Sequence, residues 1–130
     1  PEIVIDWAEK LFELGVRDFA LCDTIGSSDP ATIQSLYPKL VQQLTDAVVG
    51  MHLHTTPDSW QEKIAAAYDA GCRSFDGAIK GFGGCPMAKD DLTGNMPSEK
   101  MIDFLGEKET LKINRFQLSR SLELATSIFP

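Results

Sequence analysis

The chain has 130 residues, of which 43% are hydrophobic and 24% are charged, and this composition is typical of one globular domain with a modest core. Its net charge of −7 excludes a strongly basic surface, so nucleic acids and acidic membranes are not expected partners. The cysteines Cys22, Cys72 and Cys85 are odd in number and lack the spacing of a disulfide framework or a zinc knuckle, which favours a reducing cytoplasm.

Helices and buried strands are predicted to alternate along the chain. In chain order they are a helix over 1–14 stopped by Gly15, a strand over 18–23, a helix opened by the cap-rich run 27–30, a strand over 47–53, a helix from Trp60 to Gly71, a strand around 73–79, a helix over 97–105, a charged segment over 106–116 and a final helix carrying Leu118, Leu122, Ala125 and Ile128. This alternation predicts a parallel sheet with right-handed crossovers, in which ligand sites gather at the C-terminal ends of the strands.

Two histidines, His52 and His54, lie one residue apart at the end of the predicted strand over 47–53. Residues i and i+2 of a strand point to the same face, so both imidazoles are expected to converge as two adjacent ligands of a divalent ion. A His-x-His pair by itself is more often a pair of ordinary strand histidines. The residues that follow it strengthen the metal interpretation.

A glycine-rich loop over 81–86 carries Cys85, and Asn95 follows shortly afterwards. Glycines let a backbone approach a ligand closely, and the loop is expected to leave the Cys85 thiol accessible. The alternative is that Cys85 is a small apolar residue of a surface loop. Asn95 after Gly94 is either a turn residue or a further ligand.

Asp23 ends the predicted strand over 18–23, and two interpretations of its side chain stay open. It binds the backbone of the following turn, or it lies beside the metal as a carboxylate that orients a substrate hydroxyl or moves a proton. Cys22 and Cys72 lie in apolar patterns and are interpreted as core residues.

Together these motifs resemble 3-hydroxy-3-methylglutaryl-CoA lyase, a metal-dependent (β/α)8 barrel. The resemblance covers about residues 1–105 and rests on Asp-Thr-Ile-Gly at 23–26, His-Leu-His at 52–54, Gly-Phe-Gly-Gly-Cys-Pro at 81–86 and Gly-Asn at 94–95. The first two motifs are shared with the isopropylmalate and homocitrate synthases of the same superfamily. Gly-Gly-Cys-Pro is the signature of the lyase.

The resemblance implies that His52 and His54 ligate Mg²⁺ or Mn²⁺ and that Asn95 supplies an amide oxygen. It also implies catalytic roles for Cys85 as a thiol, for Asp23 as an acid/base or substrate-orienting carboxylate, and for His52. The expected reaction is metal-assisted cleavage of 3-hydroxy-3-methylglutaryl-CoA to acetoacetate and acetyl-CoA, in leucine degradation or ketone-body formation. The alternatives are a condensing synthase or aldolase of the same superfamily, and a non-catalytic, self-associating half-barrel.

Some features of the family pattern are changed or missing. Thr55 follows the second histidine where these lyases usually carry Asp, and the Asp-Arg pair of their first barrel strand has no counterpart. A whole (β/α)8 barrel typically needs about 250 residues. We therefore expect an α/β fold that is a partial TIM barrel, with its C-terminal strands over 1–105 and a helical extension over 106–130.

Such a partial barrel is expected to be inactive alone and to associate with the missing N-terminal half or with itself, because unpaired strand edges recruit other chains. The expected substrate is an acyl-CoA. The expected location is the cytoplasm, or the mitochondrial matrix if an upstream leader exists.

Overall fold

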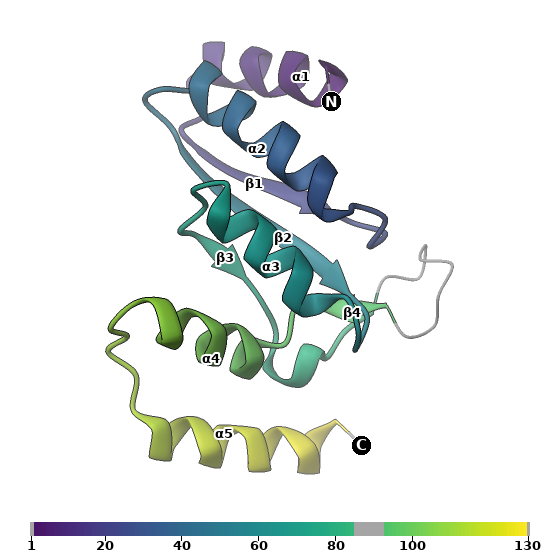
Figure 1. The fold of residues 1–130 in the computed structure, drawn as a ribbon, viewed down its shortest axis with the longest axis vertical. Helices are drawn as coiled ribbons and strands as arrows, with labels where there is room; N and C mark the ends of the chain where they lie inside the picture. Colours follow the sequence, from purple (N-terminus) through teal and green to yellow (C-terminus); the bar gives the residue numbers. More distant parts are fainter. Residues whose placement is uncertain (1, 85–92, 130) are drawn as a thin grey trace.

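The computed structural model describes residues 2–84 and 93–129, which form an α/β fold (Figure 1). In chain order its elements are α1 (Glu2–Glu13), β1 (Asp18–Asp23), α2 (Pro30–Gln43), β2 (Val48–Thr55), α3 (Trp60–Asp69), β3 (Phe75–Asp76), the 3-10 turn η1 (Ile79–Gly81), β4 (Gly94–Asn95), α4 (Ser98–Lys108) and α5 (Arg115–Ile128). The predicted alternation of helices and strands is confirmed.

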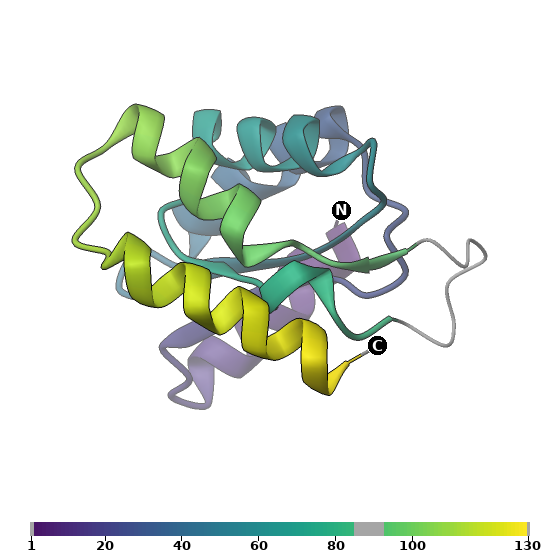
Figure 2. The same cartoon turned by 90° about the horizontal axis from the view of Figure 1, so that it is seen from below.

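The sheet is parallel and has the strand order β1, β2, β3, with β4 added antiparallel at the end of β2. Helices α2 and α3 lie side by side over one face of it (Figures 1 and 2). Each connects two parallel strands, which is the arrangement that βαβ crossovers impose. The C-terminal ends of β1 and β2 therefore meet at one edge of the sheet.

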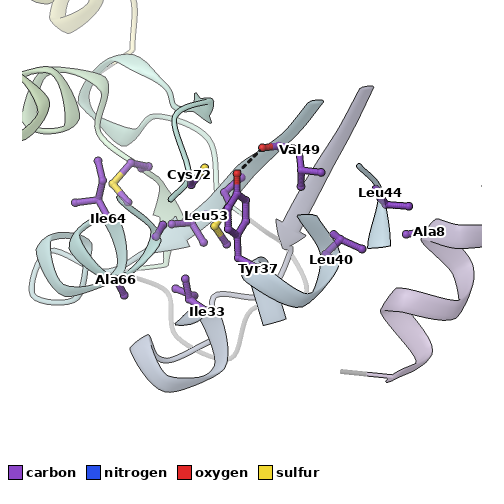
Figure 3. Packing of buried hydrophobic residues seen from close by; sticks show 13 residues of the cluster. Ala8, Ile33, Tyr37, Leu40, Leu44, Val49, Leu53, Ile64, Ala66 and Cys72 are labelled. Atoms are coloured by element: carbon purple, nitrogen blue, oxygen red, sulfur yellow. Dashed lines mark hydrogen bonds between the residues drawn. The ribbon is translucent and has the colours of Figure 1, made fainter. Parts of the chain in front are cut away.

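The core fills the space between the sheet and these two helices (Figure 3). It is built mainly from Ile33, Tyr37 and Leu40 of α2, Val49, Met51 and Leu53 of β2, and Ile64 and Ala67 of α3. The three β2 residues alternate along the strand, so its odd-numbered positions face the helices and its even-numbered positions face the other side. The Tyr37 hydroxyl donates a hydrogen bond to the Val49 carbonyl at 2.8 Å, which satisfies its one buried polar group.

The third strand is shorter than predicted: β3 covers only Phe75–Asp76, whereas the expected strand runs over 73–79. The reason is that β4 occupies the next positions along the same edge of β2. The amide of Ala78 donates instead to the Met96 carbonyl, at 3.0 Å, and the chain then turns into η1.

The C-terminal helices follow the sheet. Helix α4 runs to Lys108, beyond the end at residue 105 that the sequence predicts for this helix. Helix α5 is capped by Asn114, whose side chain accepts a hydrogen bond from the Gln117 amide, and it packs against η1. Among the described helices, none combines the length and the apolar character that crossing a membrane would require.

Candidate active site

The two histidines of β2 share one face of the sheet, as their spacing predicts. Their rings are 5.1 Å apart between centroids and nearly perpendicular, at 81°. His54 is buried and His52 is partly exposed. In register, His52 lies between Cys22 of β1 and Asp76 of β3, so both of these residues share its face. The site is therefore on the side of the sheet opposite α2 and α3.

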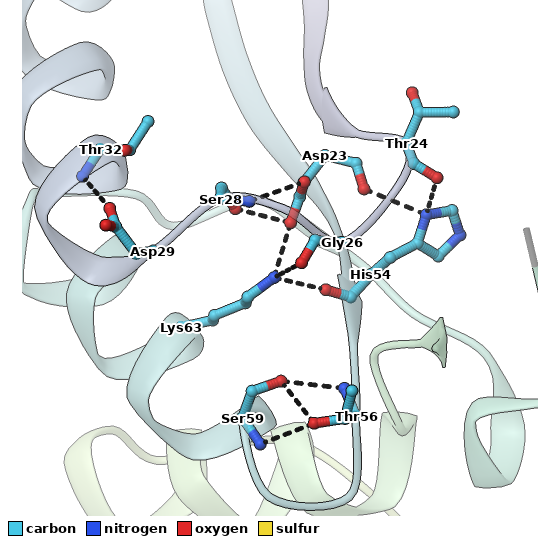
Figure 4. Close-up of polar contacts among 10 residues, drawn as sticks. All are labelled: Asp23, Thr24, Gly26, Ser28, Asp29, Thr32, His54, Thr56, Ser59 and Lys63. Carbon is cyan, nitrogen blue, oxygen red and sulfur yellow. Dashed lines mark hydrogen bonds and ion pairs between the residues drawn. The ribbon is translucent and has the colours of Figure 1, made fainter. Parts of the chain in front are cut away.

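The ring of His54 is held by two backbone carbonyls (Figure 4). Its Nδ1 lies 2.7 Å from the Thr24 oxygen and 3.1 Å from the Asp23 oxygen. Carbonyl oxygens only accept hydrogen bonds, so this network assigns the proton to Nδ1 and leaves the lone pair on Nε2. That is the tautomer of an imidazole that ligates a metal through Nε2 while its second nitrogen is oriented by a neighbour.

Asn95 reaches the same place from β4, where it lies opposite His54 in the antiparallel register. Its side-chain nitrogen donates to the carbonyls of Phe82, at 2.8 Å, and Gly83, at 3.0 Å. Both amide hydrogens are thus committed, and no donor among the described residues binds the side-chain oxygen, which is the atom that could contact a cation.

The glycines of the loop before Cys85 are required by the approach of Asn95. Gly81 has φ +69°, and a Cβ there would lie 2.8 Å from the Asn95 carbonyl oxygen. Gly83 has φ +87°, and a Cβ there would lie 2.9 Å from the side-chain nitrogen of Asn95. The close backbone approach predicted for this loop is therefore an approach to Asn95. Cys85, the predicted catalytic thiol, lies outside the described residues.

The carboxylate of Asp23 lies away from the histidines. In register Asp23 pairs with Leu53, so its side chain is on the face that α2 and α3 cover. It accepts hydrogen bonds from the Ser28 amide, the Ser28 hydroxyl and the Lys63 ammonium, at 3.1, 2.6 and 2.7 Å. Burial raises the pKa of Asp23, but these hydrogen bonds outweigh it and hold the pKa below its ordinary value. The structure thus gives Asp23 a role in binding the turn, and its acid/base role stays a prediction.

Sequence reasoning missed two charged residues of this region. Lys63 is 3% exposed and forms an ion pair with Asp23. Its burial could have been predicted, because Lys63 lies on the same helix face as Trp60, Ile64 and Ala67. A charged residue on such a face needs a partner.

The second missed residue is Asp76, whose carboxylate oxygen lies 3.8 Å from Nδ1 of His52. This separation is too long for a hydrogen bond but close enough for an electrostatic contact. An acid within a predicted strand next to the histidine strand was the available signal.

The interpretation of Cys22 as a core residue is wrong, because its side chain is exposed. Burial alternates along β1, and only Phe19, Leu21 and Asp23 face the helices. Partial burial and the nearby charge of Asp76 raise the pKa of the Cys22 thiol. Cys72 is fully buried, as predicted.

The donor set that the described residues offer a metal is two imidazoles and one amide oxygen. Over 2–84 and 93–129, no three His, Cys, Asp or Glu side chains are grouped closely enough to hold an ion. The chemistry of this donor set, imidazole nitrogen and amide oxygen, is of the kind that divalent cations accept. All three donors are neutral, so they bind a hard cation weakly without a carboxylate.

The fold and the site define part of a (β/α)8 barrel whose candidate ligands lie at the C-terminal ends of parallel strands. The family model described as HMGL-like matches residues 1–125, and the chain belongs to this family.

Relatives support this assignment. Hydroxymethylglutaryl-CoA lyase of Pseudomonas mevalonii is 36% identical over 108 residues, which are 81% of this chain and 35% of that protein. (R)-citramalyl-CoA lyase of Chloroflexus aurantiacus is 35% identical over 102 residues, which are 78% of this chain and 32% of that protein. The crystal structure of the HMG-CoA lyase from Brucella melitensis superposes with a TM-score of 0.83 at 27% identity, covering 96% of this chain and 44% of that one. The chain spans about a third of the length of the curated relatives that it matches.

Proposed function

We propose that this chain supplies the C-terminal part of the active site of a metal-dependent carbon-carbon lyase. The observation that carries the proposal is the placement of His52, His54 and Asn95 on one face of the sheet at the end of β2. Among the described residues, the hydrogen bonds of His54 and Asn95 use Nδ1 and the side-chain nitrogen, and not Nε2 or the side-chain oxygen. Both relatives are named as lyases that act on a CoA thioester, so the proposed substrate is 3-hydroxy-3-methylglutaryl-CoA or a closely similar 3-hydroxyacyl-CoA.

The proposed ligands of the cation are Nε2 of His54, a ring nitrogen of His52 and the amide oxygen of Asn95. Nitrogen and oxygen donors of this kind suit Mg²⁺ or Mn²⁺, and Mn²⁺ tolerates imidazoles better. When bound, the ion supplies Lewis-acid polarisation of a substrate oxygen and orients the substrate. A carboxylate ligand from the rest of the barrel is needed to complete a tight site.

The chain's own residues then divide the proton transfers. Cleavage requires that the substrate's tertiary hydroxyl lose its proton while the bond between C2 and C3 breaks. A neutral imidazole has one lone pair, so His52 takes this proton only where His54 and Asn95 hold the cation without it. Where His52 is itself a ligand, the proton passes to a base on the rest of the barrel. The bond's electron pair passes to the leaving acetyl-CoA enolate, and Cys85 is the proposed donor that protonates its carbon. The products are acetoacetate and acetyl-CoA, as in leucine degradation and ketone-body formation.

The rest of a barrel has a place to pack against this chain. A groove of about 340 Å³ between α1 and β1 is lined by apolar residues, among them Trp7, Leu11 and Phe19. The outer edge of β1 has no strand partner among the described residues. We propose that an N-terminal part of a barrel covers this groove and edge, and that a second copy of the chain does so when that part is absent.

The test is product formation. The purified chain is incubated with Mn²⁺ and 3-hydroxy-3-methylglutaryl-CoA, alone and with a separately produced N-terminal part of an HMGL-like barrel. We expect acetoacetate mainly in the mixture, and (R)-citramalyl-CoA serves as the competing substrate. Condensation of acetyl-CoA with a 2-oxo acid would instead support a synthase of the same superfamily. No turnover in any mixture, together with stable dimers, would support the self-associating half-barrel.

A further inference from the structure

A buried lysine ties together the two strand ends that carry the site. The ammonium of Lys63, on α3, donates to the Asp23 carboxylate at 2.7 Å, to the Gly26 carbonyl at 2.9 Å and to the His54 carbonyl at 2.8 Å. An ammonium has three hydrogens, so its donors are fully used. The side chains of Lys63 and Asp23 are only 4% and 7% exposed, so this ion pair is largely shielded from solvent.

The same turn is also the structure that orients His54. The carbonyls of Asp23 and Thr24 accept from Nδ1 of the His54 ring. Later in the same turn, the Gly26 carbonyl accepts from Lys63 and the Ser28 amide donates to the Asp23 carboxylate. Figure 4 shows the His54 ring pointing away from Lys63, while the His54 carbonyl points toward it. Lys63 therefore binds both the turn and the backbone of His54 without touching the ring.

We propose that Lys63 and Asp23 form a positioning pair that fixes the tautomer and orientation of His54. The pair acts by clamping the 23–28 turn to the end of β2, so that the Asp23 and Thr24 carbonyls are aimed at Nδ1. This proposal rests on the proposed function, since the orientation of His54 matters to a reaction only if Nε2 binds the cation. Carbonyl partners of this kind typically change metal affinity 10- to 100-fold when they are lost.

A lysine suits this position because it must satisfy three acceptors around one point. Arginine is planar and larger, and its donors lie in a fixed fork rather than around one atom. Methionine has a similar length but no donor, so Lys63→Met leaves the Gly26 and His54 carbonyls and the Asp23 charge without their partner. Adding Asp23→Asn removes that unpaired charge, so the double variant K63M/D23N keeps side chains of similar size and lacks the clamp without leaving a buried charge.

The experiment is a long-range ¹H–¹⁵N correlation spectrum of the histidine rings of the metal-free chain. It reports which ring nitrogen carries the proton, and it needs neither catalysis nor bound metal. In the wild type we expect His54 as the Nδ1-protonated tautomer. In K63M and in K63M/D23N we expect mixed tautomers, together with a loss of about 10-fold in Mn²⁺ affinity. The matched control is Ile64→Val, which weakens the core at the next residue of α3 and is expected to leave both readouts unchanged.

A His54 ring that keeps its tautomer and its Mn²⁺ affinity in the folded double variant would overturn the proposal. An equal change in Ile64→Val would do the same, because the effect would then follow from general loosening. If Lys63→Met does not fold, the double variant decides. Failure of the wild type to bind Mn²⁺ would contradict the proposed function, while the ring signals would still decide whether Lys63 and Asp23 position His54.

Discussion

Asn95 lies opposite His54 in the antiparallel register of β4 and β2, although the two residues come from different motifs of the sequence. The glycine loop before Cys85 holds the Asn95 side chain through two carbonyls, and the turn after β1 holds the His54 ring through two others. These two candidate ligands are therefore oriented by main-chain atoms of neighbouring loops, so substitutions in those loops should alter the ligand geometry without replacing a ligand.

Gly83→Ala tests this dependence at Asn95. The residue has φ +87° and its new Cβ would lie 2.9 Å from the side-chain nitrogen of Asn95, so we expect Asn95 to shift and Mn²⁺ affinity to fall about 10-fold. The matched control is Gly15→Ala, where φ is +98° but no atom lies within 4 Å. Both variants should lose about 1 kcal/mol of stability. Equal Mn²⁺ affinity in both, measured by calorimetry, would contradict the role given to the loop.

Acid should weaken the fold through Asp23. The native pKa of Asp23 is below its unfolded value of about 3.9, so the unfolded chain binds more protons in this range. The stability from this carboxylate is complete above about pH 4 and is lost as the pH falls through the native pKa. Urea unfolding between pH 2.5 and 6 measures this slope.

Replacing the carboxylate provides the comparison for the acid slope. Asp23→Ala is expected to flatten it and to cost about 3–5 kcal/mol at neutral pH, because Lys63 is left buried without its partner. Asp103→Ala breaks an exposed ion pair with Arg115 and should cost less than about 1 kcal/mol. An unchanged acid slope in Asp23→Ala would contradict the assignment.

The described cysteines should differ in reactivity. Cys22 is exposed and Cys72 is fully buried, so iodoacetamide should modify Cys22 and spare Cys72 in the native chain. The raised pKa of Cys22 means that little thiolate is present at pH 7, and its labelling rate should keep rising above pH 9. Peptide mass spectrometry after timed labelling checks both points. Labelling of Cys72 before Cys22 would contradict the burial of Cys72 and the exposure of Cys22 on β1.

The apolar surface of α1 should make the isolated chain self-associate. Trp7 is 61% exposed and Leu11 is 44% exposed, and both line the groove between α1 and β1. Light scattering is expected to show dimers or larger species, and Trp7→Lys is expected to shift the chain toward monomers. Phe116→Lys, on the exposed surface of α5, is the control and should leave the assembly unchanged. A monomeric wild type at high concentration would contradict the proposed packing surface.

Much of the fold follows from local patterns in the sequence. The strand predicted over 18–23 coincides with β1, and the convergence of His52 and His54 follows from strand periodicity alone. The short β3 could not be predicted, because its end is set by β4, a segment that follows it in the chain and competes for the same edge of β2.

The candidate site was predicted less completely than the fold. Periodicity says which residues share a face but not which face is covered, so Cys22 was wrongly assigned to the core. The buried position of Lys63 was present in the pattern of α3, but its partner Asp23 is on another element and is brought near only by the crossover. Cys85 lies outside the described residues, so its role stays a prediction, as does the acid/base role of the Asp23 carboxylate.

The most direct test of the metal site is a calorimetric titration of the chain with Mn²⁺. Wild type is compared with His52→Ala, His54→Ala and Asn95→Ala, and Lys112→Ala serves as an exposed control. We expect weak but measurable binding in the wild type and the control, because the three ligands are neutral. Binding should be lost in both histidine variants and weakened in Asn95→Ala. Equal Mn²⁺ binding by the wild type and all three ligand variants would contradict the site.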